Sequence, residues 1–265
     1  MPYSPDGTYF EFHERADAPV VVLIHGLGLS LDTWRGYADY FEDRYSVLSY
    51  DLCGHGRSHL PQAPVDLTLL ARQLCALLDY LQIKQAALVG FSLGGMINRR
   101  FALDYPDRLT ALAILNSPHE RSPEDQLAVE KRASDASGGG PEATIDAALA
   151  RWFTDEFTRQ SPDVVDWVRQ AVLANDAKNY AAHRWVLAAG VKELIRPHPP
   201  LGCPALVMTS ALDSGSTVAM AEAIASQIEG AELLIIPGCK HLGLLEYPEG
   251  FAQPVRAFLD RHLQQ

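Results

Sequence analysis

The segment that most constrains the fold is residues 90–95, Gly-Phe-Ser-Leu-Gly-Gly, which directly follows the apolar run at residues 86–89. This order predicts a short buried strand, a tight turn and a helix that begins at Leu93. The glycines suit the turn because side chains two residues to either side of the serine would collide across it. Such a turn holds Ser92 in a strained conformation that projects its hydroxyl above the sheet edge. The alternative is a glycine-rich turn that contains a serine by chance.

Catalysis by a serine hydroxyl needs a base and an acid, and the chain after Ser92 offers a candidate for each. The hydroxyl becomes a good nucleophile when a general base removes its proton, and an acid fixes the tautomer of that base. Asp213 follows a predicted strand at residues 203–209, and His241 lies in the loop after the next predicted strand, residues 233–236. Because consecutive loops of a parallel sheet emerge at one edge, we expect Asp213 and His241 to be neighbours. Singly, Asp213 suits a helix entry and His241 a surface loop, but their order after Ser92 predicts a catalytic triad.

Two backbone N–H groups are predicted to stabilise the oxyanion that forms when a serine attacks a carbonyl. The first belongs to Leu93, directly after the nucleophile and at the positive end of the predicted helix. The second is assigned to Leu27, in the glycine-containing loop at residues 25–28 after the predicted strand at residues 20–24. His25 is expected to orient this loop by hydrogen bonding.

Together these motifs resemble the α/β-hydrolase superfamily along essentially the whole chain. The resemblance rests on residues 25–28, 51–58 and 90–95 together with Asp213 and His241. Within the superfamily the chain is most similar to 3-oxoadipate enol-lactonases and related small serine carboxylesterases. The resemblance implies an α/β-hydrolase fold, with a mainly parallel central sheet flanked by helices and an inserted helical cap.

The cap segment and one substitution refine this resemblance. Residues 150–154, 162–165 and 175–180 resemble the cap segment of the enol-lactonases. Cys53 departs from the pattern of that group, in which an arginine is common at this position. In some α/β-hydrolases the acid follows the preceding strand, which here ends near Asn116 and has only Glu120 close to it.

The pattern of strands and helices divides the chain into two parts. Strands alternate with helices in the first third, which predicts a mainly parallel sheet covered on both faces. After residue 118 the chain is helical without strand signals, and strand character returns at Pro204. We therefore predict a discontinuous core at residues 1–118 and 199–265, with a helical cap inserted at residues 119–198.

A cap over the catalytic edge would exclude water and shape the substrate pocket. The aromatic candidates for substrate binding are Trp34, Trp152, Tyr180 and Trp185. Ordinary packing is the alternative for each, and Trp152 is favoured because it matches a cap tryptophan of the lactonases. A carboxylate on the substrate would require a cation, for which Arg100, Arg151 and Arg184 are candidates.

These assignments predict hydrolysis of a small carboxylic ester or lactone through an acyl-enzyme on Ser92. His241 accepts the serine proton and Asp213 stabilises the resulting imidazolium. Two alternatives remain open. One is cleavage of a carbon–carbon bond in a vinylogous diketone by the same triad, and the other is a non-enzymatic small-molecule receptor with a hydrolase fold.

Composition narrows the class of partner. The 265-residue chain is 48% hydrophobic, which is enough to form a core. Its formal net charge of −11 disfavours nucleic acid and anionic membranes as partners. It does not disfavour a small anionic substrate. The N-terminus lacks the features of a signal peptide, and no apolar run approaches the roughly 20 residues that span a bilayer. The four cysteines show no metal-binding spacing. We expect a cytoplasmic protein without metal or cofactor; the sequence does not predict its oligomeric state.

Overall fold

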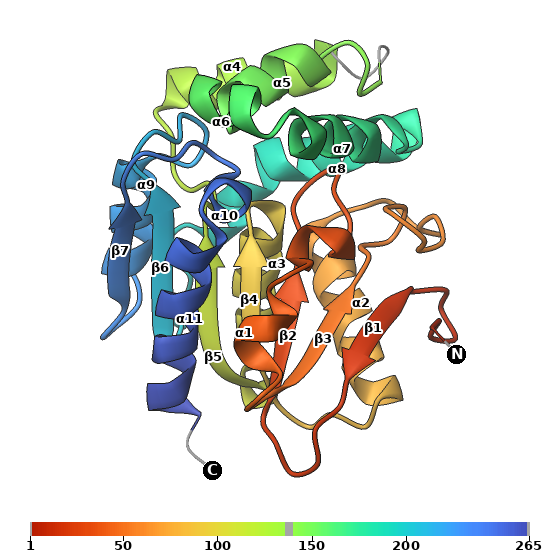
Figure 1. The fold of residues 1–265 in the computed structure, drawn as a ribbon, viewed down its shortest axis with the longest axis vertical. Coiled ribbons are helices and arrows are strands. Elements are labelled where there is room, and N and C mark those ends of the chain that lie inside the picture. The colour runs from red at the N-terminus through yellow and green to blue at the C-terminus, as the bar shows by residue number, and fades with distance from the viewer. Residues whose placement is uncertain (1, 136–139, 264–265) are drawn as a thin grey trace.

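The computed structural model describes residues 2–135 and 140–263, and in this part of the chain seven strands form one sheet (Figure 1). The strands are β1 (Phe10–His13), β2 (Val20–Ile24), β3 (Ser46–Tyr50), β4 (Ala86–Phe91), β5 (Leu109–Leu115), β6 (Ala205–Ser210) and β7 (Glu232–Ile236). Their order across the sheet is β1-β3-β2-β4-β5-β6-β7. β1 is antiparallel to β3 and the other neighbouring strands are parallel, so the sheet is mainly parallel, as the sequence predicts.

The central strands are apolar because helices cover both faces of the sheet. Every residue of β4 is buried, and β4 lies between β2 and β5 in the sheet. Gly90 pairs with Ile24 on one side and with Ile114 on the other, so the three strands end at the same edge. Residues that follow these strands are therefore brought close together, although they are far apart in the sequence.

The covering helices lie in two groups (Figure 1). On one face of the sheet lie α1 (Ala38–Phe41) and α11 (Pro248–His262), and on the other lie α2 (Leu67–Tyr80) and α3 (Leu93–Asp104). α9 (Val218–Ser226) packs against β6 and β7, and α10 (Gly243–Glu246) directly precedes α11. Three short 3-10 helices complete the covering elements: η1 (Leu31–Trp34), η2 (Pro106–Arg108) and η4 (Gly190–Leu194).

Among the described residues between β5 and β6, five helices form a layer across the carboxyl ends of the parallel strands (Figure 1). They are α4 (Pro123–Asp135), α5 (Ile145–Trp152), α6 (Asp155–Gln160), α7 (Pro162–Leu173) and α8 (Ala177–Ala189). We call them the helical layer. They fall within residues 119–198, the predicted cap, whose described residues form no strand.

Side-chain amides connect the helical layer to the loops at the sheet edge. Asn175 donates to the carbonyl of Gly28 at 2.9 Å, and Asn179 donates to that of Gly54 at 2.8 Å. On the other side, the Leu242 N–H donates to the carbonyl of Trp152 at 2.9 Å. The layer is therefore held on opposite sides of the edge where β2, β4 and β5 end.

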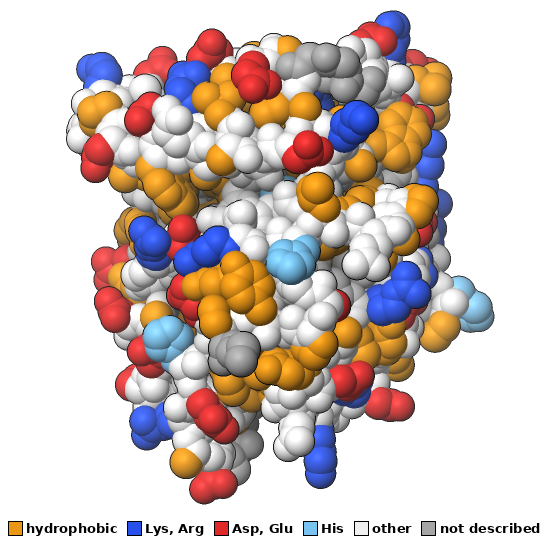
Figure 2. Space-filling model, turned by 90° about the vertical axis from the view of Figure 1, so that its right-hand side faces the viewer, with side chains coloured by type: hydrophobic (Ala, Val, Ile, Leu, Met, Phe, Trp, Pro, Cys, Tyr) orange, Lys and Arg blue, Asp and Glu red, His pale blue; other side chains and the backbone are white. Residues whose placement is uncertain are grey.

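The surface carries both signs of charge. On the face seen in Figure 2, acidic and basic side chains are interspersed rather than gathered into one patch. No helix of the described chain has both the length and the apolar composition needed to cross a membrane.

Candidate active site

The turn after β4 places Ser92 at the sheet edge. Ser92 has φ of 54° and ψ of −110°, a strained conformation for a residue with a side chain. A Cβ on Gly90 would overlap the carbonyl of Gly94, and one on Gly94 would overlap the carbonyl of Ile24. The Ser92 N–H donates to the carbonyl of Leu115 at 2.9 Å, which ties the turn to β5. At Gly90 the collision runs across the turn, as the motif predicts, whereas at Gly94 it is with the end of β2, which the motif alone does not show.

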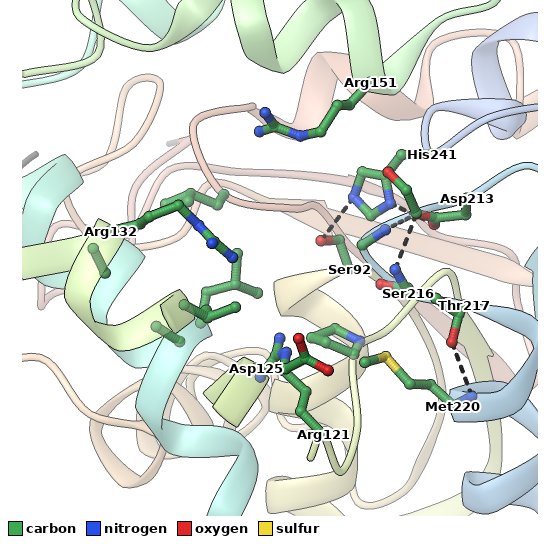
Figure 3. A pocket seen from close by; sticks show the side chains of 18 of the residues that line it. Ser92, Arg121, Asp125, Arg132, Arg151, Asp213, Ser216, Thr217, Met220 and His241 are labelled. Carbon is green, nitrogen blue, oxygen red and sulfur yellow. Dashed lines mark hydrogen bonds and ion pairs between the residues drawn. The ribbon is translucent and has the colours of Figure 1, made fainter. Parts of the chain in front are cut away.

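The structure brings Ser92, Asp213 and His241 into one hydrogen-bonded chain (Figure 3). The Oγ of Ser92 lies 3.1 Å from Nε2 of His241, and Nδ1 of His241 lies 2.6 Å from Oδ2 of Asp213. Asp213 follows β6, and His241 lies in the loop between β7 and α10. With Nδ1–H donating to the carboxylate, Nε2 is free to accept a proton from the serine.

Asp213 is the most completely bonded member of this chain. Its side chain is 1% exposed, and its Oδ1 accepts the backbone N–H groups of Gly215 and Ser216 at 2.8 and 2.9 Å. Its Oδ2 accepts from His241 and from Nδ2 of Asn116, the latter at 2.9 Å. Burial by itself raises the pKa of Asp213, but the charge of His241 and these hydrogen bonds outweigh it, so the pKa is lowered. The acid therefore stays ionised.

The alternative position for the acid, directly after β5, holds Asn116 and, nearby, Glu120, and neither residue bonds to His241. Asn116, directly after β5, donates to Asp213 and is fully buried. The carboxylate of Glu120 instead pairs with Arg196 at 2.9 Å, with its side chain 40% exposed. The sequence pointed to Asn116 only as a place where an acid can stand. Its hydrogen bond to Asp213 depends on the approach of β5 and β6.

The loop at residues 25–28 passes close to the nucleophile. A Cβ on Gly26 would lie 3.3 Å from that of Ser92. His25 is fully buried, its Nδ1–H donating to the carbonyl of Gly26 at 2.8 Å and its Nε2 accepting from the Leu52 N–H at 3.0 Å. Both ring nitrogens of His25 are thus engaged in holding loops.

The two N–H groups predicted for the oxyanion belong to the loop that passes close to Ser92 and to the residue that follows Ser92. Leu27 lines the cavity above the triad, and Leu93 is the first residue of α3. Within the described residues, neither N–H has a hydrogen-bond acceptor in the protein. Both can therefore donate to a ligand oxygen.

Arg99, which sequence reasoning missed, supports the turn that carries the nucleophile through Ser117 and Pro118. It is buried, and it donates to Ser117 Oγ at 3.0 Å and to the carbonyl of Pro118 at 2.8 Å. Ser117 in turn donates to the carbonyl of Ser92 at 2.9 Å. Burial lowers the pKa of Arg99 to about 9. An arginine on an amphipathic helix is usually solvated, so its sequence position carries no signal of burial.

A cavity of about 810 Å³ lies over the triad, between the sheet edge and the helical layer. Trp152 and Tyr180 line it. Trp34 and Trp185 do not: Trp34 is 3% exposed and packs edge-to-face on Tyr37, while Trp185 is 47% exposed on α8. Two of the four predicted substrate-binding aromatics therefore lie outside the cavity, because η1 and α8 turn those side chains elsewhere.

Four arginines line the same cavity: Arg121, Arg132, Arg151 and Arg184. Arg100, the third cation proposed from sequence, is absent from its walls and bonds Asp104 and Glu193 at 2.8 Å each. Arg132 was not a candidate, since nothing in the sequence shows which face of α4 meets the cavity.

The cysteines lie outside the reaction chain. Burial raises the pKa of Cys53 to about 12 and those of Cys203 and Cys239 to about 11. These thiols are protonated near neutral pH and are poor nucleophiles. Among the residues that the structure covers, no cluster of three or more His, Cys, Asp or Glu is suited to holding a metal ion.

Comparison with known proteins matches this architecture. The model of the family described as alpha/beta hydrolase fold matches residues 19–248. The chain is 30% identical to 3-oxoadipate enol-lactonase 2 of Acinetobacter baylyi, over 93% of this chain and 91% of that protein. The enol-lactonase of Burkholderia xenovorans LB400 has a TM-score of 0.85 at 28% identity, covering 95% of this chain and 96% of that one.

A thermophilic esterase from Thermogutta terrifontis, solved with malate bound, has a TM-score of 0.85 at 26% identity and covers 97% of this chain and 94% of that one. The predicted resemblance and fold class are confirmed. The chain belongs to the α/β-hydrolase fold family, and the two enol-lactonases and the esterase to which it is similar are hydrolases.

Proposed function

We propose that this protein is a serine hydrolase that cleaves a carboxylic ester or a lactone. The observation that carries the proposal is the hydrogen-bonded chain Ser92–His241–Asp213 at the base of an 810 Å³ cavity. Similarity to an enol-lactonase and an esterase supports the same chemistry. We also propose that the helical layer acts as a cap that shields the reacting groups from water.

In the first half of the reaction, Nε2 of His241 accepts the proton of the Ser92 hydroxyl as the oxygen attacks the carbonyl carbon. The negative charge that develops on the carbonyl oxygen is stabilised by the N–H groups of Leu27 and Leu93. Asp213 stabilises the imidazolium of His241. Its own hydrogen bonds to Asn116 and to backbone N–H groups keep it ionised throughout.

In the second half, the imidazolium returns the proton to the departing alkoxide, which leaves an acyl group on Ser92. His241 then takes a proton from water, and the hydroxide attacks the acyl carbon. For a lactone the alcohol stays attached to the acyl group, so the product is one hydroxy acid, or its keto form when an enol-lactone opens. His241 protonates Ser92 again as the acid leaves.

The test is hydrolysis of p-nitrophenyl esters from acetate to decanoate, with an enol-lactone assayed alongside and Ser92→Ala as the control. We expect turnover that is abolished in the variant, with chain-length preference reporting the usable depth of the pocket. Cleavage of a vinylogous diketone without ester turnover would replace this proposal by carbon–carbon hydrolysis. Tight binding of a small molecule without turnover of any substrate would replace it by a receptor.

A further inference from the structure

Three arginine side chains from three different helices line the cavity without an acidic partner. Arg132 comes from α4, Arg151 from α5 and Arg184 from α8. Figure 3 shows Arg132 and Arg151 extending into the cavity from different sides. Among the described residues no carboxylate pairs with any of the three, and Arg184 donates only to the neutral hydroxyl of Thr144, at 3.3 Å. Glu120, Asp125 and Asp213 also line the cavity, but Glu120 pairs with Arg196, Asp213 with His241, and Asp125 accepts from Ser122. The three arginines are therefore cations of the cavity wall without a paired carboxylate in the described part of the chain.

Arg151 lies close enough to Arg184 and Arg132 for their charges to affect its pKa. Burial lowers the pKa of Arg151, and the charges of Arg184 and Arg132 lower it further. Arg121, in the same cavity, is different because the nearby carboxylates of Asp125 and Glu130 counteract part of the lowering of its pKa by burial and by Arg132.

The three arginines contrast with the rest of the chain, which is acidic overall. The formal net charge of the protein is −11, and elsewhere in the helical layer Arg169 pairs with Asp146 at 2.6 Å. Solvated arginines on helix surfaces need no partner, and Arg132 and Arg151 are reached by solvent. Three from separate helices that line one cavity form a different arrangement, because a single bound anion can be attracted by all of them.

From this arrangement we infer that the substrate carries two or more carboxylates on the part that does not react, bound by Arg132, Arg151 and Arg184. One carboxylate would leave two of the three charges unbalanced. The planar guanidinium fork suits carboxylate oxygens, which it binds through paired hydrogen bonds. A cavity of about 810 Å³ has room for such an acid beside the ester group. The inference rests on the proposed ester or lactone hydrolysis and specifies its substrate class.

The kinetic test compares three methyl esters: methyl butyrate, monomethyl glutarate and the monomethyl ester of tricarballylate, with zero, one and two free carboxylates. We expect kcat/KM to rise with each carboxylate. Arg151→Gln and Arg184→Gln should each lower the ratio of kcat/KM for the two-carboxylate ester to that for methyl butyrate by about 5- to 50-fold. Arg151→Lys keeps the charge and should retain part of the preference. Arg169→Gln, in the same layer but paired outside the cavity, should leave the ratio as in the wild type.

Binding to the Ser92→Ala protein tests the site without turnover. Calorimetry should find tricarballylate bound more tightly than glutarate, and butyrate weakest, with affinities that fall as sodium chloride is added. Arg132→Gln in this background should weaken tricarballylate about 5- to 50-fold. Tighter binding of pyrophosphate than of tricarballylate would overturn the assignment of carboxylates.

The two proposals fail in different ways. Hydrolysis of methyl butyrate as fast as of the charged esters, or equal losses on all three esters in the arginine variants, overturns the carboxylate inference and leaves ester hydrolysis intact. Arginine-dependent binding of tricarballylate without turnover of any ester or lactone overturns the proposed reaction and leaves the anion site. Thermal unfolding of each variant identifies losses that come from misfolding.

Discussion

The sheet edge and the helical layer above it differ in whether their charged side chains have partners within the protein. At the edge, Asp213 accepts four hydrogen bonds, and Ser92 and His241 complete a chain with no unpaired charge. In the layer, Arg132 and Arg151 line the cavity and neither has a paired carboxylate among the described residues. The edge is complete before any ligand arrives, whereas the arginines of the layer are, in our proposal, paired by the substrate. We infer that the reaction depends on the edge and substrate choice on the layer.

The largest expected effect comes from breaking the edge itself. His241→Ala removes the general base, so kcat should fall by about 10⁴-fold or more, while the unfolding temperature stays close to that of the wild type. Steady-state kinetics and calorimetry measure the two quantities. His13→Ala, at an exposed histidine on β1, is the matched control and should retain full activity. Substantial turnover by His241→Ala would refute the assignment.

The next effect distinguishes the two acid positions. Asp213→Asn keeps the shape but lets the amide donate to His241, which disfavours the required tautomer, so kcat should fall by about 10²- to 10⁴-fold. Glu120→Gln breaks only the exposed pair with Arg196 and should change kcat by less than about 3-fold. The opposite ranking in steady-state kinetics would move the acid to the loop after β5.

The junction between the two regions predicts a dependence of stability on pH. His183, on α8, lies edge-to-face on His55, with ring centroids 4.5 Å apart. Burial lowers the pKa of His183 to about 4. The hydrogen bond to the Asn179 carbonyl opposes this by raising the pKa, and the charge of His25 lowers it further. The unfolded chain binds this proton near pH 6.5, so the free energy of unfolding falls as the pH drops from about 6.5 to about 4.

His183 accounts for on the order of 3 kcal/mol of this loss. His183→Phe should therefore flatten the dependence on pH in that range, as measured by urea unfolding at several pH values, with pH 8 as the reference. An unchanged slope in the variant would mean that the proton binds elsewhere, for example at His119, whose pKa burial also lowers to about 4.

The smallest effects compare two tryptophans of the layer. Trp152 lines the cavity and its ring lies 6.4 Å from that of His241, so Trp152→Ala should raise KM by about 10-fold. Trp185 is 47% exposed and outside the cavity, so Trp185→Ala should leave kcat/KM unchanged. Equal losses in both variants would show that the layer acts through its packing rather than through the residues that face the substrate.

Local sequence was sufficient at the sheet edge. Residues 90–95 predict a strand, a turn and a helix because each step follows from steric limits within six residues. Asp213 and His241 could be placed beside Ser92 because each follows a parallel strand, and parallel strands end at a shared edge. These rules were sufficient to predict the parallel sheet and the hydrogen-bonded chain of Ser92, His241 and Asp213.

Only the tertiary structure decided which side chains of the helical layer meet the substrate cavity. Trp152 and Trp185 are both tryptophans on helices of the layer, and helical periodicity offers no way to tell the one at the cavity from the one in solvent; only the resemblance to the lactonases favoured Trp152. The same holds for Arg132, which faces the cavity, and Arg100, which pairs with acids elsewhere. The physical reason is that helical periodicity defines faces, while the packing of five helices on one another and on the sheet determines where each face points.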